Sequence, residues 1–259
     1  MNIMMLGDIV GSAGRAAACA AVARARASGQ ADVVIANAEN AAGGRGITPA
    51  IADDLFHAGI DAITLGDHVW DQKDLAPRLP QDRRLIRPLN CAPDCPGFGW
   101  STLSTPAGKV TVVSLLGRVF LPPVADCPFR AFDRFWNELP AGHGPVIVDV
   151  HAEATSEKIA LGWHLDGRAN IVAGTHTHVQ TSDERILPRG TAYITDLGMT
   201  GPSDSVLGRS VATVLRKFIT GMPVKMEVSE NSPVAEGIRV ELTPSGMAVR
   251  IERFREIPS

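Results

Sequence analysis

Short apolar runs alternate with helix-like segments through the first half of this 259-residue chain, and this rhythm constrains the fold more than any other feature. Ile3–Leu6, Val33–Ala36 and Ala62–Leu65 are typical of buried strands. The alanine-rich segment Gly14–Arg26 predicts a helix between the first two of them. Thr48-Pro49 opens a second helix, because threonine is a good N-cap and proline suits the first turn. The order predicts an α/β fold on a largely parallel sheet that is covered on both faces.

Beyond Pro88 the chain is richer in glycine, proline and β-forming residues. No repeat, low-complexity tract or long linker interrupts it, so we expect a single domain over residues 1–259. The further elements that we expect are antiparallel strands at 100–104 and 110–115, buried strands at 146–150 and 171–173, helices at 131–139, 156–165 and 206–219, and a hairpin of 237–242 with 247–254.

Charge and hydropathy narrow the range of partners. The formal net charge of −3 argues against nucleic acid as an obligatory partner, because proteins that bind polyanions usually carry a basic excess. We interpret the cluster of Arg83, Arg84 and Arg87 as a solvated face. No apolar run approaches the ~18 residues that span a bilayer, and the chain begins without a basic leader. We therefore expect a cytoplasmic protein that acts on a small molecule without a membrane partner, and a homo-oligomer stays open.

Groups that bind metals or protons follow five of the predicted strands. In a parallel sheet the carboxyl ends of the strands share one edge, and ligands bind in the crevice beyond it. Side chains far apart in the sequence would therefore converge. They are Asp8, Glu39 with Asn40, Asp67 with His68, His151, and His176 with His178.

The residue types indicate the chemistry of such a site. Oxygen and imidazole donors without thiolate suit manganese, iron, cobalt or zinc. There are more donors than one tetrahedral ion needs, and two ions that share a carboxylate would use them all. In His176-Thr177-His178 an extended backbone would place both imidazoles on the same side of the chain. Two ions that flank a water suit in-line attack on phosphorus.

Taken alone, each piece has a plainer interpretation. A lone Asp8 more often caps a turn, and Asp67-His68 could be a structural pair. A single His151 is more often a core histidine. The stretch from Gly7 to Gly14 looks like a dinucleotide loop, but its glycines do not have the G-x-G-x-x-G spacing. The loop Gly43–Gly46 either wraps a phosphate through its N–H groups and Arg45 or is a flexible connector. The combination favours metal.

Several of these motifs resemble a known family. Gly7-Asp8, Gly66-Asp67-His68, His151 and Gly174-Thr175-His176-Thr177-His178 resemble the signature blocks of calcineurin-like metallophosphoesterases. The likeness implies a sandwich of mixed β-sheets flanked by helices. It also implies two metal ions per chain, iron (Fe²⁺/Fe³⁺) or alternatively Mn²⁺. More narrowly, the blocks 7–11, 37–40, 151–158, 174–180 and 196–202 resemble the YmdB-like bacterial phosphodiesterases.

Carried over by position, the resemblance gives each residue a role. Asp8, Asn40 and His178 would hold one ion. Asp67, His151 and His176 would hold the other, and Glu39 would bridge the two. A hydroxide between the ions would attack the phosphorus of a 2′,3′-cyclic nucleotide, or also of a 3′,5′-cyclic one. His68 would act as the general acid that protonates the departing ribose oxygen.

One residue departs from the family pattern. The usual third block is Gly-Asn-His, whereas this chain has Gly66-Asp67-His68. With two divalent ions, the carboxylates of Asp8, Glu39 and Asp67 leave a net charge of about +1, compared with about +2 for an asparagine. We expect Asp67 to tighten metal binding and to make the bridging water less acidic.

Two rival functions remain open at this point. The same donors could serve a metal-dependent hydrolase of another ester or of an amide. Alternatively, the chain could sense cyclic nucleotides with little turnover. The segment Cys91–Phe120 is expected to form one wall of the pocket.

Overall fold

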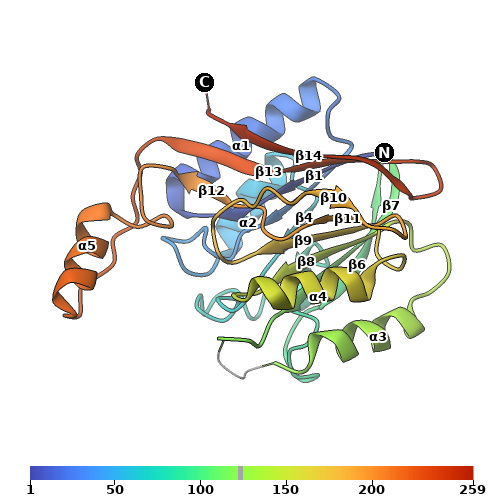
Figure 1. Cartoon of the computed structure of the whole chain (residues 1–259), viewed down its shortest axis with the longest axis horizontal. Coiled ribbons are helices and arrows are strands. Elements are labelled where there is room, and N and C mark those ends of the chain that lie inside the picture. Colours follow the sequence, from blue (N-terminus) through green and yellow to red (C-terminus); the bar gives the residue numbers. More distant parts are fainter. Residues whose placement is uncertain (122–124, 259) are drawn as a thin grey trace.

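The computed structural model describes residues 1–121 and 125–258. Within these residues a pair of mixed β-sheets packs face to face, and helices cover their outer faces (Figure 1). The first sheet has the order β2-β12-β13-β1-β3-β4-β5, and β14 also pairs with β13. Its strands are β1 (Asn2–Leu6), β2 (Asp8–Ile9), β3 (Val33–Asn37), β4 (Ala62–Thr64), β5 (Leu85–Ile86), β12 (Met199–Pro202), β13 (Pro233–Leu242) and β14 (Ala248–Glu256).

The second sheet has the order β10-β11-β9-β8-β7-β6. Its centre is parallel from β11 to β7, whereas β10 and β6 are antiparallel to their neighbours. The antiparallel pairing of β6 with β7 confirms that prediction. The strands are β6 (Trp100–Thr105), β7 (Gly108–Leu116), β8 (Val146–His151), β9 (Ile171–Thr175), β10 (Arg185–Ile186) and β11 (Ala192–Ile194).

The first sheet is covered on both faces, as predicted, but a second sheet covers one of them, and the antiparallel pairings of β13 make the first sheet mixed rather than largely parallel. Each sheet buries one face against the other sheet, and the cluster between them includes Met5 and Ile35 from the first sheet and Val112 and Ile147 from the second. A strand that is apolar on both sides indicates that both faces are covered, but not whether a helix or a second sheet covers them. The structure is therefore a sandwich of four layers, in which two sheets pack face to face between two outer layers of helices.

Helices occupy the outer layers. Against the first sheet lie α1 (Gly11–Ala27) and α2 (Pro49–His57), and the α2 N-cap is Thr48, whose Oγ1 accepts from Ile51 N at 3.3 Å. Against the second sheet lie α3 (Pro128–Glu138) and α4 (Thr155–Leu165). A short 3₁₀ helix, η1 (Leu79–Gln81), precedes β5. None of the helices in the described ranges is long and apolar enough to cross a membrane.

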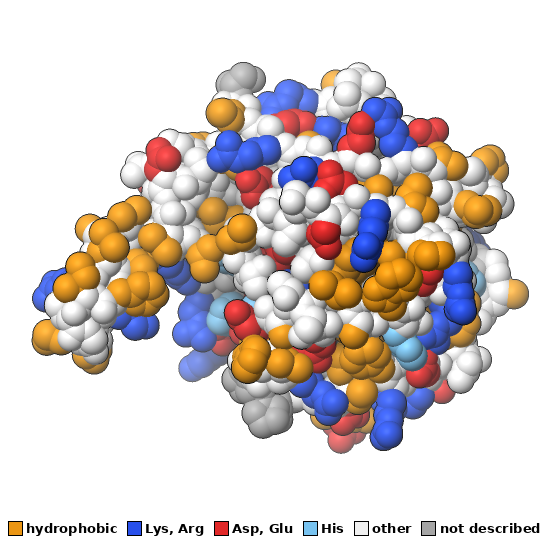
Figure 2. Space-filling model, viewed as in Figure 1, with side chains coloured by type: hydrophobic (Ala, Val, Ile, Leu, Met, Phe, Trp, Pro, Cys, Tyr) orange, Lys and Arg blue, Asp and Glu red, His pale blue; other side chains and the backbone are white. Residues whose placement is uncertain are grey.

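The last helix, α5 (Val211–Thr220), projects from the body of the molecule (Figure 1). The sequence predicts its start at residue 206, but Val206 and Arg209 pair in a β-bridge and Leu207 has a φ of 52°, so helical backbone begins only after them. Hydrophobic side chains cover much of the visible surface of α5 (Figure 2). Phe218 is 74% exposed.

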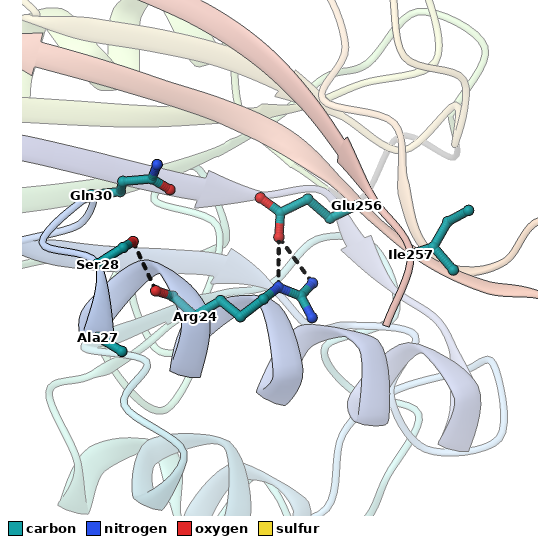
Figure 3. Close-up of a pocket in the computed structure, with 6 residues that line it drawn as sticks. All are labelled: Arg24, Ala27, Ser28, Gln30, Glu256 and Ile257. Atoms are coloured by element: carbon teal, nitrogen blue, oxygen red, sulfur yellow. Dashed lines mark hydrogen bonds and ion pairs between the residues drawn. The ribbon is translucent and has the colours of Figure 1, made fainter. Parts of the chain in front are cut away.

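Two charged regions prove to be structural. At the end of β14, Glu256 accepts a hydrogen bond of 2.9 Å from Arg24 of α1, which ties the last strand to the first helix (Figure 3). Our interpretation of the second region, the arginine cluster at 83–87, as a solvated face holds for the exposed Arg83 but was wrong for Arg87. Arg87 is buried and donates to backbone carbonyls, and Arg84 pairs with Asp82.

Candidate metal centre

The predicted site residues come from both sheets and meet at one edge of the sandwich. In the first sheet Asp8 opens β2 directly after β1, and the loops after β3 and β4 supply Glu39 with Asn40, and Asp67 with His68. In the second sheet His151 is the last residue of β8, and His176 and His178 follow β9. We expected one sheet to supply all of them. The convergence instead needs the two sheets to face each other.

Four of these residues form a tight cluster around the imidazole of His151. Its Nε2 lies 2.9 Å from Glu39 Oε1, 3.0 Å from Asp67 Oδ1 and 3.0 Å from His176 Nδ1. Asp67 Oδ1 and His176 Nδ1 are 3.3 Å apart. Donors held at about 2.1 Å from one ion lie about 3 Å from each other, which matches these separations. The cluster could bind a metal ion.

The electrostatics of the cluster also fit a cation. Asp8 Oδ1 is buried and has no hydrogen-bond partner among the described residues, and the buried Glu39 Oε1 faces the imidazole of His151. A buried carboxylate oxygen without a partner is costly unless a positive charge faces it. Burial opposes a charged His151, yet Glu39 and the other nearby carboxylates raise its pKa well above the ordinary value. This group of residues therefore holds positive charge strongly.

Three further residues adjoin the cluster at longer distances. His178 Nε2 lies 3.8 Å from Asp8 Oδ1 and 3.5 Å from the side-chain amide of Asn40. The two ends of a carboxamide have the same shape, so a half-turn would present the oxygen of Asn40 to a cation. The structure thus brings together all seven residues that the sequence indicated as ligands.

A buried network below the cluster fixes the orientation of His151. Thr175 Oγ1 donates to Asp149 Oδ1 at 2.6 Å and lies 2.8 Å from His151 Nδ1. Since its proton is used on Asp149, Thr175 must accept from Nδ1–H, which leaves the lone pair on Nε2 free for a metal. The other oxygen of Asp149 accepts from Asn37 and Thr64 of the first sheet. Burial raises the pKa of Asp149.

The sequence analysis missed this network, although one signal was present. An acidic residue stands inside the otherwise apolar run 146–150. A buried aspartate at such a position needs hydrogen-bond partners, which indicates a buried polar network.

The turn that carries His176 and His178 is not extended. Both residues lie beyond β9, with φ angles of 93° and 62°, so the prediction of an extended backbone was wrong. Asp196 holds the turn, because its Oδ2 accepts from Thr177 Oγ1 and from the buried Lys158 ammonium, each at 2.6 Å. Left-handed backbone at non-glycine residues is strained and is common at functional sites.

Glu153 orients the second clustered histidine. Its Oε2 lies 3.1 Å from Nε2 of His176. With that nitrogen occupied, His176 presents Nδ1 to the cluster, as the 3.0 Å distance to His151 Nε2 also indicates.

His68 stands beside the cluster rather than within it. Its Nδ1 lies 2.9 Å from Asp71 Oδ2, and the same oxygen is 2.9 Å from Arg45 Nε. Its backbone N–H donates to Glu39 Oε2 at 3.2 Å. The arrangement leaves Nε2 of His68 available to a substrate.

Gly66 allows the chain to approach the cluster closely. A Cβ at this position would lie 2.1 Å from His151 Cδ2 and 2.4 Å from Glu39 Oε2. Any larger residue would displace two of the clustered side chains.

A cavity of about 410 Å³ opens onto the cluster. Segment 91–120 contributes no residue to it within the described ranges, so the prediction that this segment forms a wall was wrong. The wall comes instead from residues 206–226 (Figure 2). The lining residues on the side of the cluster are Glu39, Asn40, His68, Glu153, His176, Thr177 and His178, and those of the wall are Val206, Leu207, Arg209, Val214, Lys217, Phe218 and Met226.

A family model described as YmdB-like protein matches residues 4–254. The chain belongs to this family. This confirms the resemblance seen in the sequence blocks.

Relatives within and beyond the family agree with the fold. The chain is 43% identical over 255 residues to the 2′,3′-cyclic-nucleotide 2′-phosphodiesterase of Bacillus subtilis (strain 168), covering 98% of this chain and 96% of the relative. It is similar to the crystal structure of a novel phosphatase from Mycoplasma pneumoniae, with a TM-score of 0.92, 35% identity and coverage of 99% and 93%. A 5′-nucleotidase precursor from Thermus thermophilus shares the fold, with a TM-score of 0.62, 12% identity and coverage of 100% and 55%. The fold is the calcineurin-like sandwich of mixed sheets.

Proposed function

We propose that this protein hydrolyses 2′,3′-cyclic nucleoside monophosphates at a two-metal centre, with 3′,5′-cyclic nucleotides as further substrates. Family membership makes it a phosphoester hydrolase. The choice of a cyclic nucleotide is supported by the name of the Bacillus subtilis relative.

The observation that carries the proposal is the set of donors about 3 Å apart around His151 Nε2, beside the buried Asp8 Oδ1, which lacks a partner among the described residues. Donors from oxygen and imidazole, without thiolate, suit manganese, iron, cobalt or zinc, and the family resemblance points to iron or manganese among them. When bound, two such ions would supply Lewis acidity, which lowers the pKa of a water and neutralises charge on the phosphoryl oxygens. Asp67, His151 and His176 would hold one ion, Asp8, Asn40 and His178 the other, and Glu39 both.

The protein's own groups supply orientation and a proton. Thr175 and Asp149 fix the tautomer of His151, and Glu153 fixes that of His176. His68, held at Nδ1 by Asp71, donates the proton on Nε2 to the departing O2′. The oxygen of the attacking water forms a new bond to phosphorus as the P–O2′ bond breaks. The product is a nucleoside 3′-phosphate.

Metal analysis followed by assay tests this function. Protein purified without added metal and then reconstituted with iron or manganese should hold about two ions per chain. It should convert 2′,3′-cyclic AMP to the 3′-phosphate. One ion or fewer per chain would contradict the two-metal assignment.

The same assay separates the rival functions. Hydrolysis of carboxylic ester or amide reporters with no action on phosphodiesters would indicate another hydrolase. Tight binding of 2′,3′-cyclic AMP without product, in fully loaded protein, would indicate a sensor.

A further inference from the structure

The cavity has a cationic wall that the hydrolysis of a mononucleotide does not use. One side carries the metal-binding cluster and His68, and the other carries Arg209 and Lys217. A nucleoside 2′,3′-cyclic monophosphate has a single phosphate, and that phosphate must lie at the cluster. Two further cations in the same cavity therefore call for a second anionic group.

Neither of these cations is neutralised within residues 1–121 and 125–258. Arg209 Nη2 donates to the carbonyl of Gly44 at 2.7 Å, and no described carboxylate lies within 4.0 Å of its guanidinium. Burial, together with the positive charge of Arg45, lowers the pKa of Arg209. Lys217 makes no ion pair with a described carboxylate. Arg209 is half-buried, so its unpaired positive charge is unfavourable until an anion binds, whereas Lys217 is exposed and can reach toward such an anion from the rim of the cavity.

The glycine-rich loop at 43–46 supports this anion site by holding Arg209 in place, with the Gly44 carbonyl as acceptor. The N–H groups of Gly44 and Arg45 donate to the carbonyls of Asn40 and Ala42, at 3.0 and 3.3 Å. They are thus not free to wrap a phosphate, an option that the sequence leaves open. Gly44 instead makes room for Arg209, because a Cβ there would lie 2.6 Å from its Nη1.

Apolar side chains line the same cavity as the two cations. Val214, Phe218 and Met226 line the same wall, and Phe218 is largely exposed. An aromatic side chain beside positive charge is a common surface for a stacked base next to a phosphate. The wall therefore combines an aromatic side chain that can stack on a base with cations that can bind a phosphate.

We propose that Arg209 and Lys217 bind a phosphodiester on the 5′ side of the reacting nucleotide, so that the preferred substrates are short RNA fragments ending in a 2′,3′-cyclic phosphate. This rests on the proposed function. In such a fragment the 5′ oxygen of the last ribose carries a second phosphate, which a mononucleotide lacks. The net charge of −3 does not oppose this, since only a local pair of cations is needed.

The chemistry places the protein after an RNA-cleaving reaction. A 2′,3′-cyclic end forms when a ribose 2′ oxygen attacks the adjacent phosphorus and displaces the 5′ oxygen of the next nucleotide. Water then adds to phosphorus and the P–O2′ bond breaks, with the proton going to O2′. The fragment is left with a 3′-phosphate and a free 2′-hydroxyl.

The test compares two substrates in the metal-loaded enzyme. We expect kcat/KM for a diadenosine dinucleotide with a 2′,3′-cyclic end to exceed that for 2′,3′-cyclic AMP by about tenfold or more, as expected for one charged hydrogen bond. Arg209→Ala and Lys217→Ala should each remove most of this preference. Arg216→Ala is the matched control, since Arg216 is exposed on the same helix and does not line the cavity.

Binding of the products gives a second readout. Calorimetry should show that the dinucleotide 3′-phosphate binds more tightly than 3′-AMP, with a steeper salt dependence that Arg209→Ala reduces. Equal kcat/KM for both substrates, or equal losses on both in the two variants, would overturn the proposal while leaving cyclic-nucleotide hydrolysis intact. If neither substrate reacts, the proposed function itself fails.

Discussion

Thr175 determines which nitrogen of His151 faces the metal-binding cluster. Its hydroxyl lies 2.8 Å from His151 Nδ1 and gives its own proton to Asp149. A hydroxyl has only one proton to donate. Because Thr175 donates that proton to Asp149, it can only accept at its contact with His151 Nδ1. The threonine would thus influence a bound metal ion without contacting it.

Replacing this hydroxyl should weaken metal binding. In Thr175→Val the affinity should fall about ten- to a hundredfold, the usual effect of losing an outer partner of a ligating histidine. The variant should also lose about 1–3 kcal/mol of unfolding free energy, because Asp149 loses a donor. Metal titration and urea unfolding measure the two effects. Thr175→Ser keeps the hydroxyl and should behave like the natural protein.

His68 is expected to act in turnover rather than in metal binding. His68→Asn should lower kcat about 10²–10⁴-fold, the range for loss of a general acid, with the metal content unchanged. Elemental analysis beside steady-state kinetics checks this. Loss of metal in the variant would mean that His68 is a ligand.

Asp67 should set the charge of the centre. In Asp67→Asn one negative charge fewer surrounds the ionising water, so its pKa should fall. The acidic limb of the pH–activity profile should then move about 1 pH unit or more toward lower pH. Metal affinity should fall at the same time, because the asparagine is a weaker ligand. A profile that stays in place would show that Asp67 does not influence the ionising group.

Glu153 should orient His176 from outside the cluster. Glu153→Ala removes the partner at 3.1 Å from His176 Nε2, and metal affinity should fall about tenfold or more. Glu153→Gln keeps an acceptor oxygen and should lose less. The exposed Glu138 of α3, changed to alanine, is the control. Equal affinities in all three variants would remove Glu153 from the site.

Asp82 should stabilise the fold in a pH-dependent way. A hydrogen bond from Arg84 holds the pKa of Asp82 below its ordinary value. Its stabilisation is therefore present above the unfolded pKa of about 4 and is lost as the pH falls through the lower folded value. Asp82→Asn should cost about 1 kcal/mol at pH 7, after allowance for solvent screening at the half-exposed Arg84, and less at pH 3. Urea unfolding at both pH values measures this, with the more exposed Asp53→Asn as control.

The sequence predicted well where the signal is local. Polar residues directly follow the predicted strands Ile3–Leu6 and Ile171–Ala173. The carboxyl ends of parallel strands lie at one edge of the sheet, so these polar residues are placed at that edge. This logic located Asp8 and His176 without knowledge of how the sheets pack. The assignment of the residues to two ions stays a prediction.

The features that the sequence did not reveal depend on distant contacts. Asp149 binds Asn37, which lies 112 residues away in the other sheet, and no local pattern pairs them. The backbone of His176 and His178 is set by Asp196 and Lys158, so strand periodicity could not describe it. The wall at 206–226 depends on where α5 begins, and an amphipathic pattern locates a helix end poorly.

The origin of the metal donors in two different sheets has a thermodynamic consequence. An ion held by Asp67 of the first sheet and His151 of the second would link the two sheets to each other. Because the donors come together only in the folded chain, each tenfold rise in free metal above the dissociation constant adds about 1.4 kcal/mol to the stability of the fold. The supply of metal would then govern how long the protein survives as well as how fast it works.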